Sequence, residues 1–314
     1  MAKESERCEW LDLTEALREF AVATYGTASQ RHIRPVHWYM ACRLCLEGGF
    51  DPDEITPRPP FRVSRLSSDP RRRILEYTPE LAGSGEQIIL GGLRTKQVDV
   101  VITKPGIGPV VAISMKGTQK AFRNLTNRLE EAGGDCTNLH ITYPALVYGY
   151  WAVIRANRPG PVPSDAPKAL QSDDGIMRRS DIAVTDSGQP QPCIMRYHQA
   201  LSGLSGRNGI RDDVSRYEAV ALTLVNVGEN GLGTISAQYP AQDSPLRFEG
   251  FLHAIYTQYD LRFVYQAPEL VSRTYRVGWD ESSPALQSWR IAEYRARLQE
   301  SEDMMRDISD EACQ

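Results

Sequence analysis

Long hydrophobic runs are missing from this sequence of 314 residues. A membrane-spanning helix needs roughly 18 or more consecutive apolar residues, and no such stretch occurs, so we expect no membrane-spanning segment. The opening stretch MAKESERCEW is polar and charged, unlike a secretory signal peptide. These absences favour a soluble protein of the cytoplasm.

The cysteine pattern of a disulfide framework is missing too. The six cysteines are scattered without regular spacing, and Cys42 and Cys45 are the one close pair. No second ligand pair with the spacing of a zinc site follows them. Zinc held with His32 and His37 is an alternative, and buried free thiols are the favoured interpretation.

A glycine-rich phosphate loop is likewise missing, because GSGEQIILGG matches neither GxGxxG nor a Walker loop, so we expect no nucleotide cofactor. The formal net charge of -4 excludes a surface coated in positive charge but not a local basic surface. Such a concentration lies in PRPPFRVSRLSSDPRRR, which ends with Arg71, Arg72 and Arg73. It is either an irregular proline-rich connection or an arm that contacts phosphates.

Hydrophobic periodicity predicts a mixture of helices and strands. We expect helices over residues 10–25, 35–47, 119–132, 143–154, 212–226, 247–260 and 284–306, and strands over 86–90, 97–103 and 109–116. The KPGIG turn joins the second and third strands into a β-hairpin. Residues 157–175 are rich in proline and are expected to be a loop or an insertion. The whole predicts an α/β core with additional helices around it.

The candidate catalytic residues lie on this hairpin. Asp99 lies between two valines on the first strand, while Ser114 and Lys116 share one face of the second strand. An acid, a hydroxyl and an amine would therefore converge at the open end of the hairpin. Oxygen ligands hold Mg²⁺, and an ammonium group can stabilise negative charge that grows on a phosphate. The pattern indicates hydrolysis of phosphodiester bonds.

An aspartate on one strand followed by (D/E)xK on the next resembles the PD-(D/E)xK nuclease superfamily. Here Asp99 is followed, after 14 residues, by Ser114-Met115-Lys116, with Val98 in place of the usual proline and Ser114 in place of the second acid. One subgroup of restriction endonucleases has SxK here and takes its second acid from the following helix. The resemblance implies a restriction-endonuclease-like α/β fold, with a central mixed β-sheet flanked by helices.

Two glutamates compete for the role of that helical acid. Glu130 lies 14 positions after Lys116 (130 − 116), and helical phase at about 100° per residue places it beside the buried stripe that contains Leu129. Glu131 would project toward solvent, so we expect Glu130 to be the acid. Glu47, at the end of an upstream helix, is a further candidate, although a solvated helix-end glutamate is the simpler interpretation. The resemblance thus implies Asp99 and Glu130 as ligands of Mg²⁺, and Asp99, Ser114, Lys116, Glu130 and Glu47 as catalytic residues.

The resemblance also implies double-stranded DNA as the substrate. The first expectation is a type II site-specific restriction endonuclease that acts as a homodimer or homotetramer, since two subunits are usually needed to cut both strands. The alternatives are a less specific defence or repair nuclease, or a catalytically inactive DNA-binding protein. Base readers are expected in three segments that could equally be ordinary surface. They are Arg178-Arg179, the loop with Arg207, Asn208 and Arg211, and residues 273–276 (RTYR).

These assignments divide the chain into four segments. Residues 1–80 would be a helical region with the arginine- and proline-rich arm, and residues 81–156 the catalytic core. Residues 157–283 would complete the same domain with DNA-recognition elements, and residues 284–314 would form a charged helix or tail.

Overall fold

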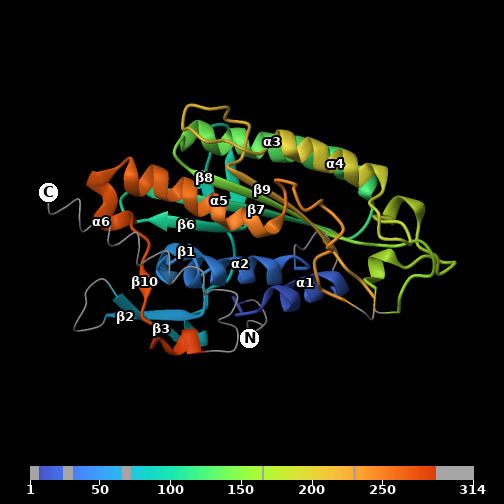
Figure 1. The fold of residues 1–314 in the computed structure, drawn as a ribbon, viewed down its shortest axis with the longest axis horizontal. Coiled ribbons are helices and arrows are strands. Elements are labelled where there is room, and N and C mark those ends of the chain that lie inside the picture. Colours follow the sequence, from blue (N-terminus) through green and yellow to red (C-terminus); the bar gives the residue numbers. More distant parts are fainter. Residues whose placement is uncertain (1–6, 24–30, 66–71, 165, 229–230, 288–314) are drawn as a thin grey trace.

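The computed structural model describes residues 7–23, 31–65, 72–164, 166–228 and 231–287 (Figure 1). The α-helices of these residues are α1 (Leu13–Val22), α2 (Arg34–Leu46), α3 (Leu125–Thr142), α4 (Pro192–Gly203), α5 (Phe248–Asp260) and α6 (Val271–Thr274). Their strands are β1 (Ile55–Thr56), β2 (Phe61–Arg65), β3 (Arg72–Tyr77), β4 (Gln87–Leu90), β5 (Thr95–Val98), β6 (Val100–Lys104), β7 (Gly108–Thr118), β8 (Val147–Arg155), β9 (Ala219–Val225) and β10 (Gly278–Trp279). None of the described helices is long and apolar enough to cross a membrane.

Five strands form a central mixed sheet in the order β1-β6-β7-β8-β9. The pairs β1–β6 and β6–β7 are antiparallel, whereas β7–β8 and β8–β9 are parallel. A parallel pair needs a crossover connection, and α3 and α4 supply the two crossovers. The predicted β-hairpin is confirmed as β6 and β7, and the fold is mixed α/β, as expected.

Helices cover both faces of this sheet (Figure 1). Alternate side chains of β7 divide between two hydrophobic clusters: Ile113 and Met115 pack with residues of α1, α2 and α5, whereas Ala112 packs with residues of α3 and α4. The same alternation places Ser114 and Lys116 on the side of α3. The candidate chemistry therefore lies beneath the N-terminal part of α3.

Two smaller sheets accompany the central one. β10, β3 and β2 form the first, in which Phe61 of β2 lies opposite Tyr77 of β3, and β4 pairs with β5 to form the second. Within the basic segment, residues 61–65 and 72–73 therefore belong to the β2–β3 hairpin rather than to an irregular connection, and the expected contact with phosphates stays a prediction. Burial of Phe61 and Leu75 against the core explains this pairing.

Two helix predictions are wrong. Residues 143–154 contain most of β8 instead, and residues 212–226 contain β9; every residue of both strands is buried. Parallel strands that are covered on both faces lose the alternation of polar and apolar residues, so they resemble buried helices in a sequence. The helix expected over 119–132 is α3, which starts later and continues through Gly133-Gly134 because Ala132, Cys136 and Leu139 extend its buried stripe.

The remaining predictions fare better. The helices expected over 10–25, 35–47 and 247–260 are confirmed as α1, α2 and α5, and the strand expected over 86–90 is confirmed as β4. The helix expected over 284–306 begins as a 3-10 turn, Pro284–Gln287, and its residues from 288 onward lie outside the described part of the chain. The central sheet takes β1 from residues 1–80, β6, β7 and β8 from 81–156, and β9 from 157–283.

The outer edge of β9 is covered by the chain that follows it. The backbone N–H of Leu222 donates to the carbonyl of Leu246 at 2.9 Å, and the N–H of Ser236 donates to the carbonyl of Leu224 at 2.8 Å. Leu246 is fully buried in the cluster beneath α3 and α4, which anchors this segment against the sheet.

Candidate metal centre

Asp99 occupies a break between two strands. It is a single bent residue between β5, which pairs with β4, and β6, which pairs with β7. Its Oδ2 accepts a hydrogen bond of 2.6 Å from the backbone N–H of Met115, and only 4% of the residue is exposed. The predicted single strand over 97–103 is therefore two strands, and the aspartate forms the corner between them.

Two further residues bring ligand atoms to this corner. His37 Nε2, from α2, lies 3.8 Å from Asp99 Oδ1, and Glu86 Oε1, just before β4, lies 4.0 Å from His37 Nδ1. One ligand atom from each of the three residues lies within 4.8 Å of the others. Among the described residues this is the one group of three or more histidine, cysteine or acidic side chains that is gathered closely enough to hold a metal ion.

The imidazole of His37 is in the right state for a metal ligand. Burial lowers the pKa of His37 to about 4 even though Asp99 raises it, and the charge of Lys116 lowers it further. The ring is therefore neutral near pH 7 and keeps a lone pair. Its buried Nε2 has no hydrogen-bond partner among the described atoms, so a polar ligand position is open beside two carboxylates.

The carboxylates of the cluster repel one another. Burial raises the pKa of Glu86, and the nearby charge of Asp99 raises it further, while Lys116 opposes the shift. A cation between the two acids and the neutral imidazole would relieve this repulsion. A divalent ion would supply that charge, and the donor set fits one.

Lys116 reaches the same region from β7. Its charge lowers the pKa of both His37 and Glu86, so it lies within electrostatic reach of the cluster. Its Nζ also lies 3.8 Å from Glu131 Oε1 on α3. The second oxygen of Glu131 accepts a 2.8 Å hydrogen bond from Arg128, which fixes this carboxylate on the helix.

The helical phase expected for the two glutamates is wrong. Glu130 is exposed, while Glu131 is partly buried and faces Lys116. The reason is that α3 packs against β4–β5 as well as the central sheet, through Asp135 and Asn138, which bond to residues of that hairpin. The buried face of α3 is therefore wider than its apolar stripe. It also includes Glu131, Asp135 and Asn138, which follow one another along one side of the helix.

Ser114 and Glu47 have structural partners. The hydroxyl of Ser114 lies 2.8 Å from that of Tyr148 on β8, and the residue is 1% exposed. Glu47 follows α2 and accepts a 2.7 Å hydrogen bond from Arg43 Nε, one helical turn earlier. Neither belongs to the His37–Glu86–Asp99 cluster, and Glu47 is tied to Arg43 rather than solvated.

Arg207 cannot read DNA in this fold. It is 1% exposed, and its guanidinium donates to Glu218 Oε1 at 2.7 Å and to the carbonyls of Pro144 and Ile210. Arg262 pairs with the same Glu218 oxygen at 2.8 Å. The prediction that Arg207 contacts DNA is therefore wrong, because the arginine belongs to a buried ion-pair network.

The other predicted DNA contacts differ in accessibility. Arg211, Arg178, Arg179 and Asn208 are exposed, and the Asn208 side chain accepts a 3.2 Å hydrogen bond from Gln258. Arg73 lies on β3 with Nη1 3.5 Å from Asp51 Oδ2, and Arg72 lies on the same strand. Arg71 lies outside the described residues.

The alternative zinc site is not assembled in the described part of the chain. Cys42 and Cys45 are buried free thiols, and Cys42 donates to the backbone carbonyl of Glu9. His32 Nε2 contacts the carbonyl of Gly117 at 3.3 Å, whereas His37 faces the acidic cluster. The two histidines therefore have different neighbours and do not converge on Cys42 and Cys45.

Sequence reasoning missed the roles of His37 and Glu86. A signal for His37 was available, because it is a histidine within the RPVHWYMACRLCL helix, whose residues are nearly all buried. A polar ring in such a helix needs a polar partner. Glu86 carries no comparable signal, since an acid before a short strand is common.

Comparison of the chain with protein-family models, with curated proteins and with solved structures gave no match.

Proposed function

We propose that this protein is a metal-dependent nuclease that hydrolyses phosphodiester bonds in double-stranded DNA. One observation carries the proposal. Three ligand atoms of His37, Glu86 and Asp99 lie within 4.8 Å of one another, at the end of the hairpin where Lys116 also lies. A gathered acidic site with a lysine beside it is an arrangement that supports metal-assisted hydrolysis of a phosphate ester.

A divalent cation fits the three candidate ligands. The two carboxylates suit Mg²⁺, the cofactor expected from the motif, while the imidazole also suits Mn²⁺. When bound, such an ion polarises a phosphoryl oxygen and lowers the pKa of a bound water molecule. His37, Glu86 and Asp99 would hold it, and the hydrogen bond from Met115 would orient the aspartate.

Lys116 would act on the phosphate itself. Its ammonium group carries a fixed positive charge next to the acidic cluster, where it can stabilise negative charge on the phosphoryl oxygens. Glu131 is a positioning residue in this scheme, because its carboxylate lies 3.8 Å from Lys116 Nζ and is held by Arg128.

The order of elements supports the finer fold proposal. A buried helix, the antiparallel β6–β7 pair, the crossover α3 and the parallel strand β8 follow one another around the site. We infer a restriction-endonuclease-like core from this order and from the motif. Site specificity of the type II kind and a homodimeric or homotetrameric assembly are proposals that rest on the motif resemblance.

Cleavage of supercoiled plasmid and of mixed linear DNA with Mg²⁺ or Mn²⁺ tests the proposal. We expect wild type to cut, and Asp99→Ala and Lys116→Ala to lose cleavage while retaining DNA binding in a gel-shift assay. Glu130→Ala is the matched control, because this exposed acid lies beside Glu131 on α3. A wild type that is inert with both metals would refute the nuclease assignment.

Sequencing of the cut ends separates the two kinds of nuclease. One recurring sequence at the ends would support a site-specific restriction endonuclease, whereas random ends would support a less specific nuclease. DNA binding without cleavage by wild type would leave a catalytically inactive DNA-binding protein.

A further inference from the structure

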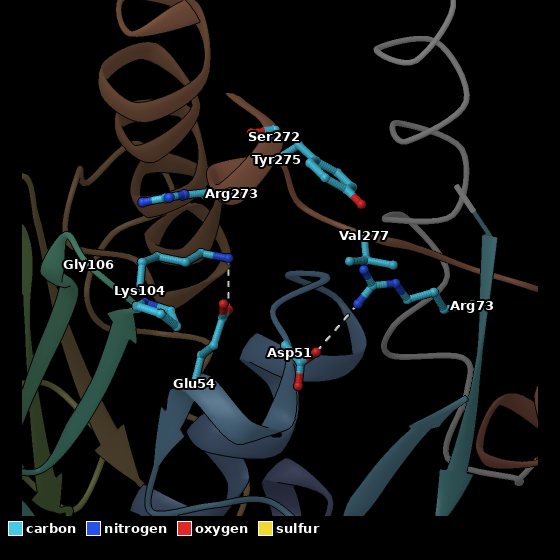
Figure 2. Close-up of a pocket in the computed structure, with 10 residues that line it drawn as sticks. Asp51, Glu54, Arg73, Lys104, Gly106, Ser272, Arg273, Tyr275 and Val277 are labelled. Atoms are coloured by element: carbon cyan, nitrogen blue, oxygen red, sulfur yellow. Dashed lines mark hydrogen bonds and ion pairs between the residues drawn. The ribbon is translucent and has the colours of Figure 1, made fainter. Parts of the chain in front are cut away.

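A polar cavity lies at the end of β6 that is remote from Asp99. It has a volume of about 540 Å³ and is bordered by the stretch after α2, by β3, by the β6–β7 turn and by α6 (Figure 2). Lys104, at the end of β6, lines it and is five residues from Asp99. At about 3.3 Å per residue, the cavity lies roughly 16 Å along the strand from the candidate metal centre.

One of the three cations of the cavity is already neutralised. Lys104 is 4% exposed, and its Nζ lies 2.7 Å from Glu54 Oε2. It also lies 5.9 Å from the centre of the Phe50 ring. Because the ammonium group of Lys104 is buried between a carboxylate and an aromatic ring, its charge is largely neutralised. It is therefore expected to contribute little to ligand binding.

Arg73 is held much more loosely. Its Nη1 is 3.5 Å from Asp51 Oδ2, the long end of the range for a hydrogen bond. Its buried Nε has no hydrogen-bond partner among the described atoms. An unsatisfied buried N–H of a charged group is unfavourable. The Arg73 side chain as a whole is 21% exposed, so an accessible nitrogen of its guanidinium can donate to an anionic oxygen in the cavity.

Arg273, on α6, is the cation without an acidic partner in the described part of the chain. It is exposed, and Figure 2 shows its guanidinium beside Lys104 at the rim, across the cavity from Arg73. It lies above the turn at Gly106, whose φ is 75°, and a Cβ at that position would be 3.2 Å from Arg273 Nη1. The glycine thus leaves room for the guanidinium.

The balance of charge favours an anion. Arg73, Lys104 and Arg273 face Asp51 and Glu54, so one positive charge is left over. The Tyr275 ring is directed toward the space between the two arginines (Figure 2), with its hydroxyl toward Val277. Guanidinium groups are donors well suited to a phosphate group and to other anionic oxygens.

We infer that this cavity binds a small phosphorylated molecule, with Arg273 at the rim holding its phosphate, Arg73 on the opposite side donating to a further oxygen of the molecule, and the Tyr275 ring packing against its organic part. The volume of the cavity indicates the size of its ligand. Cavities of about 300–1,000 Å³ hold whole small molecules, and this volume is far larger than one phosphate ion. The recess also favours a terminal phosphate over the backbone of a duplex. The inference does not depend on the nuclease proposal, since binding can be measured without cleavage.

Isothermal titration calorimetry on the full chain tests the inference. The probes are a 5′-deoxymononucleotide, ribose 5-phosphate, the matching unphosphorylated nucleoside, inorganic phosphate and a short DNA duplex. We expect both phosphorylated molecules to bind about tenfold more tightly than inorganic phosphate, and the nucleoside not to bind. Arg273→Ala should weaken their binding by about tenfold or more, and Arg273→Lys should weaken it less.

Two further variants serve as controls for the binding measurements. Arg62→Ala is the matched control, because Arg62 is an exposed arginine on the neighbouring strand β2, paired with Glu76 outside the cavity, and its loss should leave binding unchanged. Arg73→Lys keeps the positive charge but removes the guanidinium fork, and should weaken binding with an unchanged melting temperature. The inference fails if neither phosphorylated molecule binds, if Arg62→Ala weakens binding as much as Arg273→Ala, or if the duplex alone binds in an Arg273-dependent way.

Discussion

Lys116 on β7 and Glu131 on α3 face each other, with Nζ 3.8 Å from Oε1, while the adjacent Glu130 is exposed. Burial raises the pKa of Glu131, but the charges of Lys116 and Arg128 lower it by more, so the net pKa lies below the ordinary value. The carboxylate is therefore ionised near neutral pH and can hold the lysine in place.

We expect Glu131→Gln to lower the kcat of DNA cleavage by about tenfold with little change in KM. The substitution would leave Lys116 less well positioned, while substrate binding would be unaffected. Glu131→Asp should restore part of the rate. Steady-state kinetics on a defined duplex provide the measurement, with Glu130→Gln as the control. Loss of activity in Glu130→Gln alone would show that the helix presents its other acid to the site.

The metal preference follows from the imidazole ligand. We expect wild type to reach half-maximal cleavage at a lower concentration of Mn²⁺ than of Mg²⁺, because imidazole suits Mn²⁺ better. His37→Asn should reduce this preference by about tenfold, and it should also weaken Mn²⁺ binding measured by calorimetry. His198→Asn is the control, since His198 on α4 bonds to Ser244. Equal potency of the two metals with wild type would argue against ligation by His37.

The hairpin and its lysine could be predicted from the sequence because they depend on local patterns. Alternation places Ser114 and Lys116 on one face, and the Pro-Gly turn joins the strands. The position of Glu131 could not be predicted, because helical phase depends on what covers the helix. Here the β4–β5 hairpin, far from α3 in sequence, extends its buried face.

The same limit applies to the rest of the site. His37 and Asp99 are 62 residues apart (99 − 37), and only the packing of α2 beneath the sheet brings them together. The burial of Arg207 was also hidden, because its partner Glu218 looks like an ordinary acid before a strand. Apolar periodicity reports neither long-range pairing of charges nor strands that are buried on both faces.

A strained backbone position precedes α3. Ala121 has φ 56° and ψ 53°, a left-handed conformation that costs a non-glycine residue about 1–2 kcal/mol. Its N–H donates to the carboxylate of Asp181, which holds the turn. We expect Ala121→Gly to raise the free energy of unfolding by up to about 1 kcal/mol, after the greater freedom of glycine in the unfolded chain is subtracted.

Urea unfolding measures this effect. Ala200→Gly is the control, because Ala200 is equally half-buried but lies inside α4, where glycine should cost about 1 kcal/mol. A similar loss of stability in both variants would contradict the assigned strain at Ala121.

The buried Glu218 makes stability depend on pH. Burial raises the pKa of Glu218, but the hydrogen bond and charge of His140, the charge of Arg262 and the N–H of Tyr148 lower it by more, so the folded value lies below the ordinary 4.5. A lowered folded pKa means that this contribution is fully present above the ordinary value. It is lost as the pH falls through the folded value.

We expect Glu218→Gln to lose about 3–5 kcal/mol of stability at pH 7, because it leaves Arg207 and Arg262 without their buried counter-charge. Its stability should also depend less on pH below about 4.5 than that of wild type. Denaturant unfolding over a pH series tests both effects. Glu249→Gln is the control, since Glu249 forms an exposed pair with Arg247 that should contribute less than about 1 kcal/mol. Equal losses of stability in the two variants would show that the buried ion pairs of Glu218 contribute no more than an exposed pair.

The segment that follows β9 limits how copies of this chain can meet. An uncovered outer strand invites the strand of another molecule to extend the sheet. Here Ser236 and Leu246 already occupy hydrogen-bonding groups along that edge, and Leu246 is anchored in the core. A partner would have to displace this anchor before it could continue the sheet at β9. The dimer or tetramer that we propose is therefore not expected to form by extension of the central sheet at β9.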